Sequence, residues 1–166
     1  DGSLVWKADY QTMGIGFPEQ VSNTGANGIS YHTWNGKQWL LVANMGGENR
    51  TPSMSIFTID EDLTLKLTDV VNVIPGTWAE SVTGYENRAC VLGTGTTVLA
   101  ECYTIHDDGT LEFAWEYELE LSGDIDLAIR RRGHTDAPTI QFSPDGTKLA
   151  FLFNGNVDQL WPFSST

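Results

Sequence analysis

The segment IDEDLTLKL at residues 59–67 recurs as IHDDGTLEF at residues 105–113. Each copy has an acidic, polar turn that is followed by alternating apolar and polar residues. Successive side chains of a β-strand point to opposite faces, so Leu63, Leu65 and Leu67 are expected to share one face. The repeat therefore predicts two similar strands that follow similar turns in two copies of one structural unit.

The strands around this segment are repeated as well. NGKQWLLVAN (35–44), ENRACVLG (86–93) and DGTKLAFLFN (145–154) each open with a turn and continue into an apolar run. A β-prone stretch precedes each of them (GISYHTW, AESVTGY and PTIQFSP), and another follows (SMSIFTID, TVLAECYTIH and VDQLWPF). The unit is thus four short strands that recur at roughly 45 to 60 residues, which is typical of β-propeller blades.

The predicted fold is all-β: a partial β-propeller of about three four-stranded antiparallel blades, incomplete without further blades, because closed propellers have about 4 to 8. The remaining blades would come from the same precursor or from another chain. The expected division is an N-terminal segment that completes an upstream blade (1–27), two blades (28–74 and 75–120), an inserted loop (121–137) and a partial blade (138–166).

The chain is strongly acidic, with 22 Asp and Glu against 9 Lys and Arg and a formal net charge of −13. Such a charge repels phosphate backbones and anionic lipid surfaces, so neither nucleic acid nor a membrane surface is an expected partner. No run approaches the roughly 18 apolar residues of a membrane-spanning helix.

The two cysteines lie in apolar stretches on either side of a Gly-Thr-Gly-Thr turn. If these stretches form a hairpin, Cys90 and Cys102 face each other on neighbouring strands and can form a disulfide; the alternative is two buried thiols. Asn49-Arg50-Thr51 is an N-glycosylation acceptor tripeptide. Together, the paired cysteines and the acceptor at Asn49 favour a secreted, extracellular protein.

The runs TGANGISYHTWNGKQWLLVANMGG (24–47) and MSIFTIDEDLTLKLTDVVNVIPGTWAESV (54–82) resemble the lactonase-type seven-bladed β-propellers. That family includes 6-phosphogluconolactonases and carboxymuconate-cyclising enzymes, and the resemblance spans about residues 25–163. It implies a hydrolase or cyclase that acts on a small acidic lactone. The Gly-Gly that often links blades in the family is replaced here by Thr77-Trp78. The alternative is a non-catalytic extracellular propeller that binds glycan or protein, or builds an assembly.

A lactonase needs a base that activates water and groups that polarise the ring carbonyl, and histidine, carboxylates and arginine are the natural suppliers. His32 falls near the end of an innermost strand, either close to the central channel or packed as a structural histidine. Glu80 falls at the start of the next innermost strand, as a candidate base or acceptor for a sugar hydroxyl. Trp78 is positioned either to stack on a carbohydrate ring or to pack between blades.

The inserted segment carries Arg130, Arg131, Arg132 and His134. The arginines are candidates for binding a carboxylate or phosphate of the ligand, with His134 as a catalytic residue. Two alternatives are ion pairs with neighbouring aspartates and a basic protease-processing site. No cofactor is predicted, and no metal site either, because the acidic turns lack calcium-loop spacing and the cysteines and histidines lack zinc spacing.

Overall fold

The computed structural model describes residues 26–45, 51–73, 77–95, 98–119, 139–152 and 161–162, and within these ranges every regular element is a β-strand. The first sheet has the order β1 (Ala26–Trp34), β2 (Lys37–Asn44), β3 (Ser53–Ile59) and β4 (Leu65–Asn72). The second has the order β5 (Thr77–Tyr85), β6 (Arg88–Gly95), β7 (Val98–Ile105) and β8 (Leu111–Glu118). The third contains β9 (Thr139–Phe142), β10 (Leu149–Leu152) and β11 (Trp161–Pro162), with β10 in the middle.

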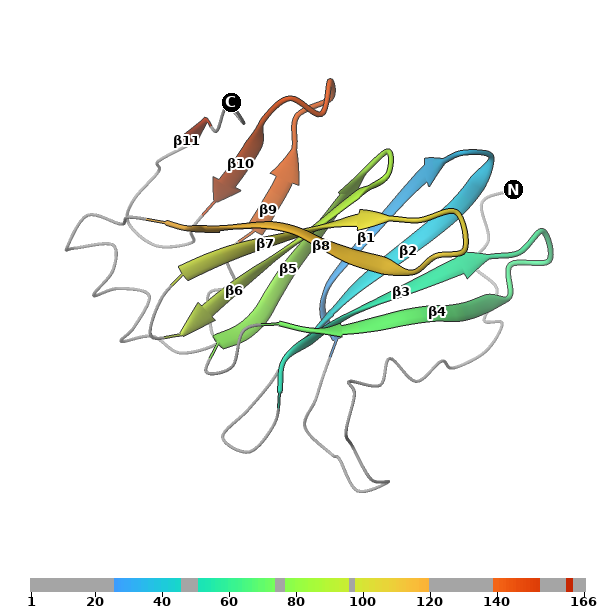
Figure 1. Ribbon diagram of the computed structural model, residues 1–166, viewed down its shortest axis with the longest axis horizontal. Helices are drawn as coiled ribbons and strands as arrows, with labels where there is room; N and C mark the ends of the chain where they lie inside the picture. The colour runs from blue at the N-terminus through green and yellow to red at the C-terminus, as the bar shows by residue number, and fades with distance from the viewer. Residues whose placement is uncertain are drawn as a thin grey trace, which may run out of the picture.

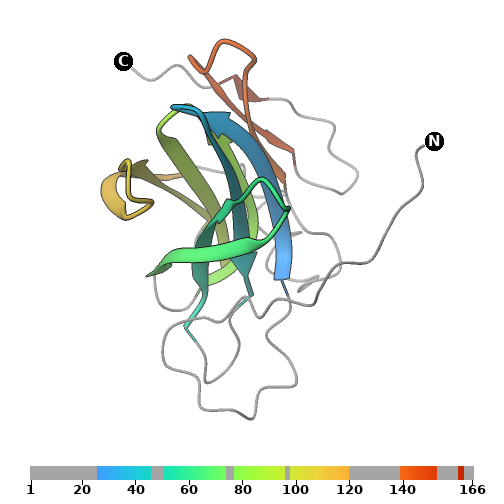
Figure 2. The same ribbon diagram turned by 90° about the vertical axis from the view of Figure 1, so that its right-hand side faces the viewer.

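The three sheets lie next to one another in chain order, in the manner of propeller blades (Figures 1 and 2). All neighbouring strands within a sheet are antiparallel, and each sheet follows chain order. The first strands of the sheets lie against one another, β1 on β5 and β5 on β9, whereas the outer strands β4 and β8 barely touch. The predicted all-β, blade-like architecture is confirmed, and the described sheets do not close into a barrel.

Two apolar cores hold the sheets together, one in each space between neighbouring sheets. The core between the first and second sheets is built around Trp39, Leu41, Met54 and Ile56, with Val82 and Val91 from the opposite side. The core between the second and third sheets contains both cysteines together with Leu92, Ile140, Phe142 and Phe151. Because each strand alternates its side chains, the second sheet can contribute to both cores at once.

A disulfide joins Cys90 of β6 to Cys102 of β7, as the hairpin interpretation predicts. The two residues are direct cross-strand partners, and their side chains are almost completely buried in the second core. An oxidised cysteine pair is typical of proteins that fold in an oxidising compartment.

Local turn chemistry explains why the strands reverse where they do. Asn35 and Gly36 both have positive φ, at 50° and 71°, which suits the tight turn between β1 and β2. The inner strands also approach closely, because a Cβ built on Gly28 would lie 2.7 Å from the Cα of Ser81. Glycine at this position of β1 thus lets the first two sheets meet backbone to backbone.

Leu63 departs from the expected alternation of the leucines. It lies in the turn before β4 rather than in the strand, with φ at 67° and 56% of its surface exposed. Its N–H donates to the carbonyl oxygen of Asp60 at 2.8 Å, and the N–H of Asp60 donates to the carbonyl oxygen of Thr64 at 3.0 Å. These turn hydrogen bonds outweigh the apolar pattern, so only Leu65 and Leu67 belong to the strand.

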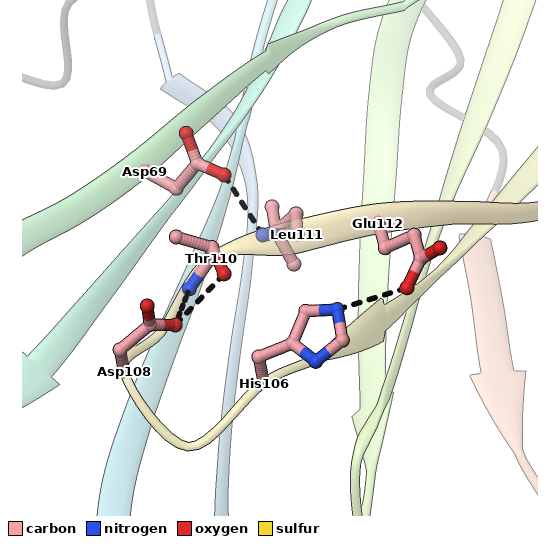
Figure 3. A network of polar contacts seen from close by, with 6 residues as sticks. All are labelled: Asp69, His106, Asp108, Thr110, Leu111 and Glu112. Carbon is pink, nitrogen blue, oxygen red and sulfur yellow. Dashed lines mark hydrogen bonds and ion pairs between the residues drawn. The ribbon is translucent and has the colours of Figure 1, made fainter.

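A polar network connects the outer parts of the first two sheets (Figure 3). Asp69 of β4 accepts a hydrogen bond at 2.8 Å from the backbone N–H of Leu111 at the start of β8. The turn before β8 is closed by Asp108, which accepts from both the N–H and the hydroxyl of Thr110. These hydrogen bonds lower the pKa of the Asp108 carboxyl, so the turn keeps its negative charge.

Candidate functional site

The inner strands begin at the end of the sheets opposite their hairpin turns, and Glu80 lies at this end of β5. A β-bulge interrupts the pairing of β5 with β6 at Glu80, since Ala79 pairs with Gly93 and Ser81 pairs with Leu92. An extra residue in one strand redirects its side chain. The carboxylate of Glu80 is therefore turned inward, where it is only 3% exposed.

Two neighbouring strands hold this carboxylate. The side-chain amide of Asn27 in β1 donates to one oxygen of Glu80, and the hydroxyl of Thr94 in β6 donates to the other at 3.0 Å. A carboxylate has about four lone-pair sites, so it can accept hydrogen bonds from several donors at once. Trp78, the cross-strand partner of Thr94, is half-buried on the same strand as Glu80.

His32 lies at the other end of β1, close to the hairpin turns, and its ring packs on Gly84 of β5. Its Nε2 is 3.0 Å from the carbonyl oxygen of Glu86. A carbonyl can only accept, so Nε2 must carry the proton and Nδ1 is the unprotonated nitrogen. Nδ1 is buried and has no hydrogen-bond partner among the described residues.

Burial lowers the pKa of His32, although the hydrogen bond to Glu86 opposes the shift. The histidine is therefore neutral at physiological pH, and its surroundings are those of a packing residue between two sheets. Four residues of extended strand, roughly 13 Å, separate Glu80 from the glycine that His32 contacts. The structure consequently does not bring Glu80 and His32 together into an acid–base pair.

The other candidate residues from the sequence lie outside the described residues: Asn49, Arg130, Arg131, Arg132 and His134. Their assignments stay predictions. Within the part of the chain that the structure describes, no group of three or more His, Cys, Asp or Glu side chains is placed to hold a metal ion. The described part of the chain also contains no helix with the length and apolarity needed to cross a bilayer.

A groove that the sequence did not reveal runs between β4 of the first sheet and β7–β8 of the second, with a volume of about 640 Å³. Glu101 and Tyr103 of β7 and Phe113 and Glu116 of β8 are among its lining residues. The Tyr103 hydroxyl donates to Glu101 at 2.6 Å, and the Tyr103 and Phe113 rings meet edge to face at 5.9 Å. Burial, helped by the negative charge of Glu101, raises the pKa of Tyr103 well above its usual value, so the phenol stays protonated.

This groove could have been suspected only from the strand 111–118, LEFAWEYE, where aromatic residues and glutamates alternate. The sequence gives no sign that β4 forms the opposite wall, because that depends on the angle between two blades.

In comparison with known proteins, the chain matches no family model and no curated protein sequence.

Proposed function

We propose that the chain contributes blades to a secreted, lactonase-like β-propeller, in which Glu80 serves a ligand site at the end where the inner strands begin. One observation carries the proposal: a buried carboxylate at the start of an inner strand is held by Asn27 and Thr94 from two other strands. A carboxylate fixed in this way can take a proton from water or accept a hydrogen bond from a sugar hydroxyl.

The reaction class comes from the sequence resemblance to lactonase-type propellers, namely hydrolysis or ring closure of a small acidic lactone. In the hydrolytic direction Glu80 removes a proton from water while the water oxygen attacks the ring carbonyl. The bond between the carbonyl carbon and the ring oxygen then breaks, and the ring oxygen takes up the proton from Glu80, which restores the carboxylate. The anionic group of such a substrate needs a cationic partner, and the guanidinium groups of Arg130, Arg131 and Arg132 are the candidates. Secretion is supported by the disulfide between Cys90 and Cys102.

A second candidate function, a non-catalytic extracellular propeller that binds protein or glycan or joins an assembly, is favoured by two observations. Glu80 and His32 lie at opposite ends of the sheets, and the Nε2 of His32 already donates to the backbone carbonyl oxygen of Glu86. The side of the first sheet that faces away from the second also exposes apolar residues, with Ile29 69% and Tyr31 55% accessible. Exposed apolar surface of this kind is typical of a surface that meets a partner.

Turnover of glucono-δ-lactone and of its phosphorylated analogue by the full chain tests the proposal. We expect Glu80→Gln to lower kcat/KM about a hundredfold or more, which is the usual contribution of a general base. Glu61→Gln, in an exposed turn, is the matched control and should leave turnover unchanged. Thermal unfolding of both variants shows whether the fold is intact.

Two results would overturn the lactonase assignment. Absence of lactone turnover in the wild-type protein would leave the binding function as the better account. Full activity in a folded Glu80→Gln variant would show that Glu80 is not the base.

A further inference from the structure

The outer strand of the second sheet, β8, has an open edge. Within the described residues β7 is the one strand that pairs with it along the backbone, although the N–H of Leu111 at its start donates to the Asp69 side chain of β4. Every residue of β8 after Leu111 is solvent-exposed. An edge strand presents unpaired N–H and C=O groups with which another extended chain can pair.

Both faces of β8 carry aromatic side chains next to glutamates. Phe113 and Glu116 line the groove on the side of the first sheet, and Phe113 is 54% exposed. Trp115 and Tyr117, at 37% and 36% exposed, lie on the opposite face, because Trp115 pairs with Cys102 of the second core. A register shift between these residues places the aromatic rings on the two sides of the strand.

The corresponding strand of the first sheet has a different composition. β4 reads LKLTDVVN, with one lysine, one aspartate and no aromatic residue. Charged residues on an edge strand protect it against pairing with another copy, and glutamates alone would meet that need in β8. Three large exposed aromatic residues favour association rather than prevent it. The position of β8 at the edge of a sheet therefore does not account for them.

We propose that β8 binds an extended, arginine-rich segment of another protein, which adds to the second sheet as a further strand. Charge complementarity selects this partner. The chain carries a net charge of −13, and β8 itself contributes Glu112, Glu116 and Glu118, so a second copy of the chain is repelled. Arginine fits this strand because its guanidinium pairs with carboxylates in a two-pronged geometry and stacks on aromatic rings.

The surroundings of β8 have room for the side chains of such a segment. The groove of about 640 Å³ runs along one face of the strand, with Glu101 of β7 and Glu116 of β8 directly opposite each other in register. The pair places carboxylate oxygens beside the Tyr103 and Phe113 rings that line the same groove. A guanidinium that enters the groove supplies positive charge at this point.

Peptide binding to the full chain, followed by fluorescence anisotropy, tests the proposal. The probes are a fluorescein-labelled peptide of four Arg-Thr repeats, its Lys-Thr counterpart, and the Arg-Thr peptide N-methylated at alternate residues. We expect one peptide per chain, an affinity that falls as salt rises, and binding at least tenfold weaker for the lysine peptide and for the N-methylated one. N-methylation removes the backbone donors that strand pairing needs, while it leaves the charge unchanged.

Variants then locate the site. Trp115→Ala is expected to weaken binding of the Arg-Thr peptide at least fivefold, and the triple change of Glu112, Glu116 and Glu118 to Gln at least tenfold. Leu67→Ala removes a comparably exposed apolar side chain from β4 and should have no effect. Thermal unfolding of each variant confirms that the fold is retained.

Three outcomes would overturn the proposal. Equal affinity for all three peptides would mean attraction by charge alone, without strand pairing. If light scattering shows a dimer without peptide, and Trp115→Ala dissociates that dimer, a second copy of the chain occupies the β8 edge. Tighter peptide binding after Arg130, Arg131 and Arg132 are changed to Ala would make the chain's own arginines the occupant.

Discussion

Gly84 is the position where a single added methyl group tests the contact between the first two blades most directly. A Cβ built on Gly84 would lie 2.3 Å from Nδ1 and 2.4 Å from Cε1 of the His32 ring. Ordinary van der Waals contact begins at 3.4 Å, so the ring would have to move by about an ångström. The same ring is held by its hydrogen bond to the carbonyl oxygen of Glu86 at 3.0 Å.

The expected cost of Gly84→Ala combines three effects. Overpacking a closely packed site costs about 1–3 kcal/mol. Displacing the ring also breaks the hydrogen bond to Glu86, at about 1 kcal/mol. Alanine lowers the conformational entropy of the unfolded chain, which offsets roughly 0.4–1 kcal/mol of this cost. The free energy of unfolding should therefore fall by about 1–4 kcal/mol, measured by urea denaturation with the disulfide intact.

A double-mutant cycle with His32→Ala isolates this contact. With the ring removed, Gly84→Ala should cost less than about 0.5 kcal/mol, because the added methyl group meets empty space. Gly36→Ala is the control: its φ is positive and no atom lies within 4 Å, so it should cost the same with or without His32. An equal penalty for Gly84→Ala in both backgrounds would refute the packing of His32 on Gly84.

Three further predictions concern pH, the disulfide and the outer network. Burial lowers the pKa of His32 in the folded chain, so the unfolded chain takes up a proton at a higher pH than the folded chain does. The free energy of unfolding should therefore decrease as the pH falls below about 6.5. Urea titrations at pH 7.5 and 5 measure this dependence, and His32→Ala should reduce it. Replacing Cys90 and Cys102 by alanine should lower stability by about 3 kcal/mol, since the bond spans 12 residues, and an unchanged unfolding midpoint would contradict this. Asp69→Ala should cost about 1–2 kcal/mol by leaving the N–H of Leu111 without its acceptor, whereas Asp69→Asn, which keeps an oxygen, should cost less in the same denaturation assay.

Much of the fold was predictable because it is encoded locally. Strand alternation, turn residues and the repeat placed the strands and their order, and the hairpin interpretation paired Cys90 with Cys102 correctly. Leu63 was the exception. Its apolar side chain matched the strand pattern, but hydrogen bonds within the turn decided its conformation, and an alternation pattern carries no information about such bonds.

The candidate site was predictable only in part. The sequence singled out both Glu80 and His32 as residues of inner strands, yet it could not show that one is held by Asn27 and the other is packed on Gly84. These contacts join residues about 50 positions apart, and they depend on how closely two sheets approach.

The sequence by itself determined most of the strands, the order in which they pair and that Cys90 can face Cys102 across a hairpin, because hairpins are local and side chains alternate with a fixed period of two. The tertiary structure alone decided which polar groups meet across neighbouring sheets, that His32 is half-buried and neutral, and that Glu101 and Glu116 share a groove with Phe113. The physical reason is that contacts between blades depend on the splay and spacing of whole sheets, which no short stretch of the chain specifies.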